Sequence, residues 1–254
     1  MSEEPKYNNV DEYIAVLKQQ LVSSPECGNT HYNLGVAYLS KREYMDAEQC
    51  FREAVANSPK NAEAYVQLGG ICLERGDLEG CLNFNRLATQ QRPFFAVPWG
   101  NIGFVLLQLG DSEKAIPALQ KAIKYDPNFV QAMATLGSAF FSRGELDDAL
   151  AQLKKAVELQ PMFGPAWNNL ALVQAELGDW AAAAESAKKA QDSGYEVPRP
   201  SWTNSPRTRN RLPGLSRDPR RSGAGSWMTE SAWPMTATSS ARLLIRGGPH
   251  GPFP

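Results

Sequence analysis

Residues 31–38 read HYNLGVAY and residues 47–59 read AEQCFREAVANSP, and the pattern of this stretch returns along the chain at one constant step. The prolines that close the copies show the step: Pro25, Pro59, Pro93, Pro127 and Pro161. A Leu or Ile followed by Gly keeps it at Leu34-Gly35, Leu68-Gly69, Ile102-Gly103 and Leu136-Gly137, and becomes Leu170-Ala171 in the last copy. Small residues recur at Ala47, Cys81, Ala115, Ala149 and Ala183, and again at Ala54, Ala88, Ala122, Ala156 and Ala190. A register kept over five copies without an insertion identifies an internal repeat.

Each copy has the pattern of two amphipathic helices, which in the first copy are expected over Thr30 to Lys41 and Met45 to Asn57. Their apolar residues follow the i, i+3, i+4, i+7 spacing of one helix face. The expected breaks between the helices fall at Gly76-Asp77, Gly110-Asp111, Gly144-Glu145 and Gly178-Asp179. Glycine favours the left-handed cap of the first helix, and proline ends the second. The repeating unit is therefore predicted to be a helix hairpin.

These residues resemble the tetratricopeptide repeat (TPR), a pattern of aromatic, Leu-Gly, aromatic, Ala, Phe, Ala and Pro. The fullest copy is residues 31–38 with Ala47, Phe51, Ala54 and Pro59, and the tryptophan of the pattern stands at Trp99 and Trp167. The resemblance covers about residues 28–193. Departures are Asn85, Leu119, Leu153 and Ala187, where Phe is usual, and Gln174, where an aromatic residue is usual.

The resemblance implies an all-α, right-handed superhelical solenoid of about five TPR hairpins, because small residues let paired helices approach and each hairpin needs its neighbour. The expected TPR domain spans residues 28–194, with repeats at 28–61, 62–95, 96–129, 130–163 and 164–194. Residues 1–27 form the N-terminal segment. Within it, residues 8–24 with Tyr13, Val16, Leu17 and Leu21 are expected to form a capping helix, the unpaired second helix of a degenerate leading repeat.

In this family the first helix of each hairpin faces the concave side, so the residues beside the Leu-Gly pair are the candidate binding residues. The residue just before that pair is Asn33, Gln67, Asn101, Thr135 or Asn169. An amide side chain offers both a donor and an acceptor, which suits an extended peptide backbone. The repeat domain of the O-linked N-acetylglucosamine transferases has a similar asparagine ladder, and the resemblance implies peptide-backbone binding. The alternative is that these amides are tolerated surface residues.

The other candidate peptide-binding residues are uncharged: Tyr32, Val36, Val66, Phe104, Gln108, Ser138, Phe141, Asn168 and Leu172. Chaperone-binding members of the family clamp a C-terminal carboxylate with Lys and Arg, and no such basic set stands at the matching places. A ligand with apolar side chains and a neutral backbone is therefore expected. For Phe104 and Phe141, burial between repeats is an equally good interpretation.

No catalytic residues, cofactor or metal site are predicted. The chain has two histidines, His31 and His250, and His31 falls where the repeat needs a packing aromatic residue. Four cysteines (Cys27, Cys50, Cys72, Cys81) lack close metal-ligand pairing, so reduced thiols are expected. The polar, acidic N-terminus lacks the features of a secretory signal, and no stretch has the apolar length of a membrane span. A cytoplasmic location is the resulting expectation.

The C-terminal part of the sequence has a different composition. Residues 197–254 contain nine Arg, no Lys and two acids, a net charge of +7, whereas residues 1–196 carry a net charge of −8. Residues 195–254 are accordingly predicted to form a disordered Arg/Pro/Ser-rich tail. Its basic residues could touch nucleic acid or anionic lipid through charge alone: Arg207, Arg209, Arg211, Arg217, Arg220 and Arg221.

An alternative is that the tail is a frameshift product. Codons for residues 201–206, SWTNSP, can spell Phe-Leu-Asp-Glu-Leu-Ala when shifted by one base, and that hexapeptide would suit a closing helix of the last repeat. The coding DNA decides between the two interpretations.

The sequence thus favours a non-catalytic scaffold or adaptor that binds another protein or an extended peptide in the TPR groove. A nucleic-acid-associated protein acting through the tail is one alternative, and nucleic acid is not expected as a partner otherwise. A truncated regulatory segment of a larger enzyme is the other. Self-association is a further expectation, because an uncapped end would expose apolar surface such as Trp180.

Overall fold

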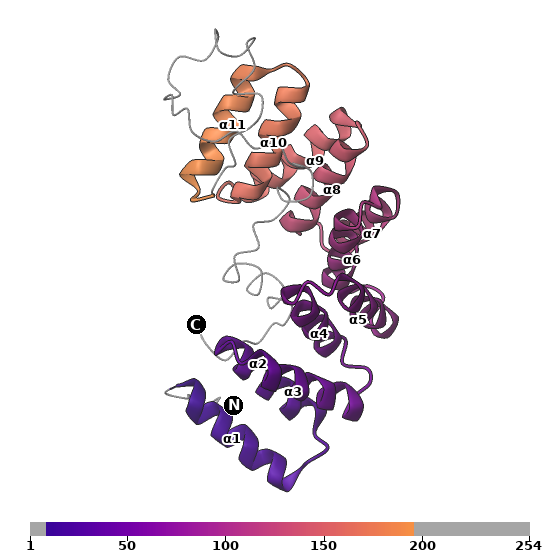
Figure 1. The fold of residues 1–254 in the computed structure, drawn as a ribbon, viewed down its shortest axis with the longest axis vertical. Coiled ribbons are helices and arrows are strands. Elements are labelled where there is room, and N and C mark those ends of the chain that lie inside the picture. Colours follow the sequence, from indigo (N-terminus) through magenta and orange to yellow (C-terminus); the bar gives the residue numbers. More distant parts are fainter. Residues whose placement is uncertain (1–8, 196–254) are drawn as a thin grey trace. The chain divides into compact units, whose positions relative to one another are not determined.

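The computed structural model describes residues 9–195, and within them the chain forms eleven α-helices and no strands (Figure 1). The helices are α1 (Val10–Ser23), α2 (Gly28–Ser40), α3 (Tyr44–Asn57), α4 (Ala62–Glu74), α5 (Leu78–Gln91), α6 (Ala96–Gln108), α7 (Ser112–Tyr125), α8 (Val130–Ser142), α9 (Leu146–Leu159), α10 (Gly164–Glu176) and α11 (Trp180–Asp192). Residues 196–254 of the predicted tail, with its basic residues and the segment 201–206 of the frameshift interpretation, lie outside the described residues.

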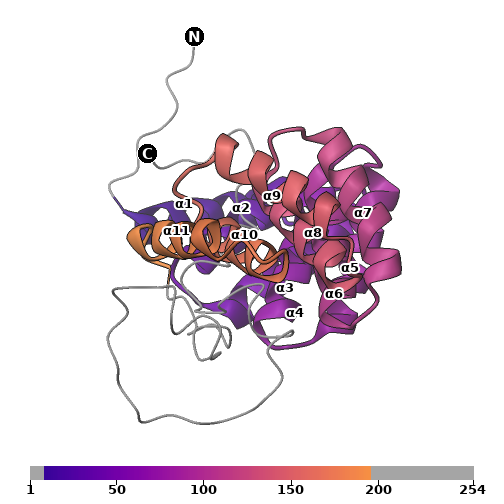
Figure 2. The ribbon, with the colours of Figure 1, turned by 90° about the horizontal axis from the view of Figure 1, so that it is seen from above.

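The helices pair as successive hairpins. The first helices begin at the same constant step as the sequence repeat, at Gly28, Ala62, Ala96, Val130 and Gly164. Within the hairpins, α2 packs against α3, α4 against α5, α8 against α9 and α10 against α11, and Figure 2 shows α10 and α11 running side by side. The described residues fall into two compact units, residues 9–102 and residues 103–195, whose boundary lies inside α6. The fold is an all-α TPR solenoid.

Glycine ends the first helix of four hairpins because the chain needs a left-handed residue there. Gly76 has φ of 75°, its N–H donates to Leu73 O at 2.9 Å, and the N–H of Asp77 donates to Cys72 O at 2.8 Å. This pair of bonds satisfies carbonyls that the helix end would otherwise leave open. The same left-handed conformation occurs at Gly110, Gly144 and Gly178.

The first hairpin makes the same turn without glycine. Arg42 has φ of 62°, its N–H donates to Leu39 O at 2.9 Å, and Glu43 N–H donates to Tyr38 O at 3.0 Å. The helices expected for the first copy leave this break between Lys41 and Met45, although Arg42 is the one member of the turn series that is not glycine. A side chain in this backbone region costs about 1–2 kcal/mol.

Arg42→Gly is therefore expected to stabilise the protein, by about 1 kcal/mol after the extra freedom that glycine has in the unfolded chain. Urea unfolding followed by circular dichroism measures the change. Gly76→Ala is the matched reverse experiment, because an added Cβ there meets nothing within 4 Å and only the backbone is strained. It should lose about 1 kcal/mol. An Arg42→Gly variant that is less stable than the wild type would contradict the left-handed turn.

The two helices of a hairpin approach closely where the first helix carries glycine. An ideal Cβ on Gly35 would lie 2.7 Å from Cε1 of Phe51, and one on Gly137 would lie 2.5 Å from Cγ of Leu153. Gly69 faces Asn85 and Gly103 faces Leu119 in the same way. In the fifth hairpin the corresponding positions both hold alanine, Ala171 and Ala187. The large residue of the second helix therefore explains why the first helix has no side chain opposite it.

Helix α1 packs against the first hairpin. Its buried side chains Ile14 and Leu17 pack with Leu34 and Ala37 of α2 and with Cys50 of α3. The helix begins at a side-chain cap, in which Asn9 Oδ1 accepts from the N–H of Glu12 at 2.8 Å.

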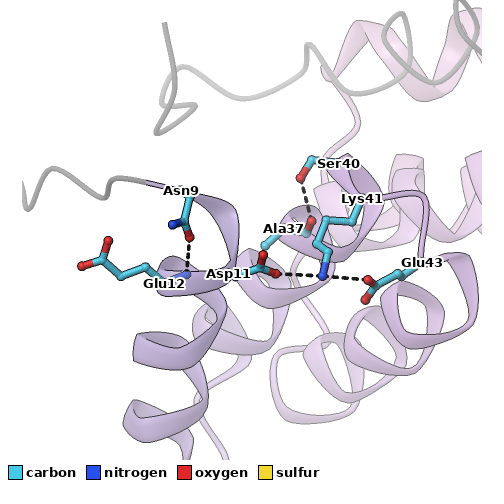
Figure 3. Close-up of polar contacts among 7 residues, drawn as sticks. All are labelled: Asn9, Asp11, Glu12, Ala37, Ser40, Lys41 and Glu43. Atoms are coloured by element: carbon cyan, nitrogen blue, oxygen red, sulfur yellow. Dashed lines mark hydrogen bonds and ion pairs between the residues drawn. The ribbon is translucent and has the colours of Figure 1, made fainter.

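An ion network also joins α1 to the end of α2 (Figure 3). Lys41 Nζ lies 2.8 Å from Asp11 Oδ1 and 2.8 Å from Glu43 Oε1. Hydrogen bonds to Asp11 and then to Glu43 raise the pKa of Lys41 above its ordinary value. Because these groups are exposed, the network contributes little stability, and apolar packing is what holds α1 in place.

Candidate functional site

The five residues of the predicted ladder occupy one equivalent position on each first helix. Asn33 lies on α2, Gln67 on α4, Asn101 on α6, Thr135 on α8 and Asn169 on α10. Because the helix starts and the ladder residues follow the same step, the five residues stand at the same turn of their helices. Their exposure differs: Asn33 is exposed, whereas the other four are between 4% and 8% exposed. Any direct contact with a ligand through those four is limited to a small area each.

In residues 9–102, Asn101 is hydrogen-bonded to the hairpin before it. Its Nδ2 donates to Asn85 Oδ1 at 2.9 Å, and Asn85 Nδ2 donates to the backbone carbonyl of Cys81 at 2.8 Å. Asn85 is fully buried, so its amide needs these partners. The residue that departs from the family's phenylalanine thus replaces an apolar contact with a polar link between hairpins.

In residues 103–195, Asn169 makes an equivalent link. Its Nδ2 donates to Ser138 Oγ on α8 at 2.8 Å, and Ser138 Oγ donates to the carbonyl of Ala134 at 3.1 Å. Asn168, which is 4% exposed, lies with its Nδ2 3.4 Å from Asn169 Oδ1. Two candidate residues, Asn169 and Ser138, are therefore brought together by the fold.

Two of the remaining ladder positions, Gln67 and Thr135, interact with neighbouring groups. Gln67 on α4 interacts with the side chain of Tyr32 on α2. Burial raises the pKa of Tyr32, and the bond from Gln67 opposes that rise. Thr135 Oγ1 donates to the carbonyl of Gln131 in its own helix at 2.8 Å.

The other candidate residues divide by exposure. Six are half-buried: Tyr32, Val36, Gln108, Ser138, Phe141 and Leu172. Three are buried: Val66, Phe104 and Asn168. Phe141 packs against the core of α8, α9 and α10, and Val66 lies in a cluster with Ala62 and Ala88. Peptide binding by this set stays a prediction, and its accessible part is Asn33 together with the half-buried side chains.

Sequence reasoning missed Asn85 as a partner of the ladder. Its signal was present, because the residues at this repeat position are Phe51, Asn85, Leu119, Leu153 and Ala187, and Asn85 is the polar one. A second polar substitution forms a similar pair, in which Ser186 Oγ donates to Gln174 Oε1 at 2.7 Å. In both places a departure from the apolar repeat pattern is matched by a hydrogen-bonding partner.

The histidine and two tryptophans of the repeat have one structural role in common. His31 Nε2 donates to Pro25 O at 2.8 Å, Trp99 Nε1 to Pro93 O at 2.8 Å and Trp167 Nε1 to Pro161 O at 2.7 Å. Each ring ties its first helix to the proline turn that precedes it.

The cysteines are free thiols, and no group of three or more metal-ligating side chains gathers among residues 9–195. Burial raises the pKa of Cys81 to about 12 and that of Cys50 to about 11. Such thiols stay protonated and unreactive at neutral pH. The pKa of Cys27 is lowered, first by a hydrogen bond with the Thr30 side chain. Within the described range, no helix combines the length and the apolar run that crossing a membrane requires.

The sequence matches the tetratricopeptide repeat family over residues 28–61, 102–162 and 135–196. These matches cover just over half of the chain, and the chain belongs to the tetratricopeptide repeat family. No curated protein sequence matches it.

Solved structures of TPR proteins share the fold at low sequence identity. YrrB, described as a TPR protein with an unusual peptide-binding site, is 22% identical with a TM-score of 0.58, covering 70% of this chain and 91% of YrrB. MamA from Desulfovibrio magneticus RS-1 is 21% identical with a TM-score of 0.58, covering 66% of this chain and 94% of MamA. PilF of Pseudomonas aeruginosa is 18% identical with a TM-score of 0.65, covering 72% of this chain and 84% of PilF.

Proposed function

We propose that this protein is a non-catalytic interaction scaffold whose first helices bind an extended peptide segment of a partner protein. The observation that carries the proposal is the row of uncharged polar side chains at one repeated position, one on each first helix, from Asn33 to Asn169. Within each compact unit, packed hairpins present these side chains without an ordering cost to the scaffold, which favours binding. The peptide-binding site named for YrrB supports this use of the fold.

The chemistry of the face favours a particular kind of ligand. None of the fourteen candidate residues is charged, and the accessible ones include polar side chains such as Tyr32 and Ser138 and apolar ones such as Leu172. A peptide with a neutral backbone and apolar side chains is complementary to this face. A ligand anchored by a terminal carboxylate would find no Lys or Arg among these residues.

Asn33→Ala tests the proposal most cleanly, because Asn33 is exposed and its side chain is in no described hydrogen bond. Linear peptides selected from a random display library on the full chain supply the ligand, and isothermal titration calorimetry measures binding. Asn33→Ala should weaken binding about tenfold, as expected for one lost hydrogen bond to the ligand, and leave the thermal midpoint unchanged. The matched control is Asn83→Ala, an exposed asparagine on the second helix α5.

A triple variant in which Asn33, Asn101 and Asn169 are all replaced by alanine should abolish recovery of a partner protein in a pull-down. Unchanged recovery, or equal effects of Asn33→Ala and Asn83→Ala on peptide affinity, would remove the ladder from the binding site. Light scattering on the same preparations tests self-association, which we keep as a separate proposal for the α10–α11 end.

A further inference from the structure

The turn between α9 and α10 exposes two large apolar side chains. Leu159 is the last residue of α9 and is 48% exposed, and Met162 in the turn is 69% exposed. Trp167 on α10 is half-buried, and its Nε1 donates to the carbonyl of Pro161 at 2.7 Å, which holds the indole ring beside the same turn. We call Leu159, Met162 and Trp167 the α9–α10 turn surface, and all of it lies within residues 103–195.

The other repeats show that the fold does not need apolar residues at these two positions. The equivalent pairs are Ser23 and Glu26, Asn57 and Lys60, Gln91 and Phe94, and Tyr125 and Asn128. Leu159 and Met162 are the one pair that is apolar at both positions. The turn after the first hairpin forms with Asn57 and Lys60, which are both exposed. Neighbouring apolar side chains that are exposed and that the hairpin does not require indicate an interaction surface.

Two lysines flank the α9–α10 turn surface. Lys189 on α11 has its Nζ 4.6 Å from the centre of the Trp167 ring. Lys155 precedes Leu159 by four residues on α9, so the two side chains are neighbours on one helix face. Lys155 is exposed and forms no ion pair among residues 9–195, whereas Lys189 pairs with Glu185 at 2.7 Å. Because that pair is exposed, it is weak, and Lys189 can bind a second carboxylate.

We propose that the α9–α10 turn surface is a second interaction site, which binds a segment of a partner protein that carries Asp or Glu beside large apolar side chains. The apolar side chains of the partner pack on Leu159 and Met162. Its carboxylates pair with Lys155 and Lys189. This site does not use the ladder residues of the first helices, so it stands apart from the proposed peptide-binding function.

The charges also decide between this partner and other occupants. Two copies of the chain joined through this surface would bring lysines against lysines, which is unfavourable. Residues 103–195 contain eight Lys and Arg and eleven Asp and Glu, a net charge of −3. A nucleic acid needs a broad basic surface, whereas a short acidic and apolar segment needs only the two lysines at the turn.

The test uses the full chain and linear peptides selected on it from a random display library, with peptides that also bind the double variant Leu159→Asn, Met162→Lys removed. The double variant carries the residues that the first hairpin has at these positions, Asn57 and Lys60, so its thermal midpoint should equal that of the wild type. The recovered peptides should be rich in Asp and Glu next to Leu, Ile, Phe or Trp. In isothermal titration calorimetry the double variant should bind them at least about tenfold more weakly.

A pair of charge reversals on α9 tests the role of the lysine. Lys155→Glu should weaken the selected peptides about tenfold, because it places a like charge beside Leu159. Lys154→Glu is the matched control, since Lys154 is also exposed but lies about 140° around the helix from Leu159. It should change the affinity by less than about twofold. Asn33→Ala should also retain the affinity, which separates this site from the proposed function.

Nuclear magnetic resonance of labelled methionine methyl groups locates the bound peptide. The peptide should shift the signal of Met162 and leave that of Met45 unchanged, because Met45 is an equally accessible methionine on α3, 85% exposed.

The inference is overturned if the selection yields no peptide, or only neutral or basic ones, or if Lys155→Glu and Lys154→Glu act alike. It is also overturned if the wild type instead binds single-stranded DNA, phosphatidylserine vesicles or a second copy of itself through Leu159 and Met162. Light scattering detects the last case as a dimer that the double variant lacks. The proposed function stands in each of these cases, because Asn33→Ala tests it separately.

Discussion

Replacing Phe51 by alanine is expected to destabilise residues 9–102 by about 3–5 kcal/mol. The Phe51 side chain is fully buried in the cluster that joins the first hairpin to α4, beside Leu68 and Ile71. Its ring centroid lies 5.7 Å from that of Tyr32, and the first helix has glycine at position 35 to admit it. Truncation would leave a large cavity that two helices cannot close without moving. Native domains are stable by only about 5–15 kcal/mol, so this single change is a large fraction of the total.

Urea unfolding followed by far-UV circular dichroism measures the loss. Val22→Ala on α1 is the control, because Val22 is 83% exposed and its truncation should change stability by no more than about 0.5 kcal/mol. A loss for Phe51→Ala comparable to that of Val22→Ala would show that the first hairpin does not pack around this ring.

Leu153→Ala is expected to cost about 2–5 kcal/mol in residues 103–195, because Leu153 is fully buried between α8 and α9. The second change in this prediction is Gly137→Ala. It should lower the stability of the wild type but raise the stability of the Leu153→Ala variant. In the wild type the new Cβ would lie 2.5 Å from Leu153 Cγ, so the helices must separate, at about 1–3 kcal/mol. In the Leu153→Ala background the same Cβ enters the cavity and gains about 1 kcal/mol of helix propensity.

The double variant reproduces the fifth hairpin, where Ala171 and Ala187 occupy these positions. Four proteins, the wild type, both single variants and the double variant, give the coupling free energy as a double-mutant cycle. We expect a coupling of about 1–3 kcal/mol. Additive effects of the two substitutions would show that Gly137 and Leu153 are not in contact.

The fold was predictable because its signals are local and repeat. The constant repeat length, the glycines of the inter-helix turns and the prolines each report on a few neighbouring residues, and repetition made them unambiguous. Residues Thr30 to Lys41, expected as a helix, differ from the observed α2 by two residues or fewer at each end. The break after this helix was also predicted, but its left-handed backbone was not, because an arginine at position 42 gives no signal of that conformation.

The site was less predictable, because its features depend on pairs of residues. The pattern located the ladder position on each first helix, but it could not show that Asn101 meets Asn85, 16 residues earlier and on a different helix. Nor could it separate Asn33, which is exposed, from Asn169, which is nearly buried in a later copy of the same pattern. Exposure depends on which neighbours stand on each side, and that information lies outside any single repeat.

The constant helix spacing has a consequence for how this chain can change in length. Pro59 and Pro93 are equivalent joints, so excising residues 60–93 would connect Pro59 to Phe94 and leave every later helix in phase. Excising one residue more would rotate the apolar stripe of the next helix by about 100° away from its partner. Insertions or deletions of whole repeats should therefore preserve the packing of the helices, whereas those of other lengths should disrupt it.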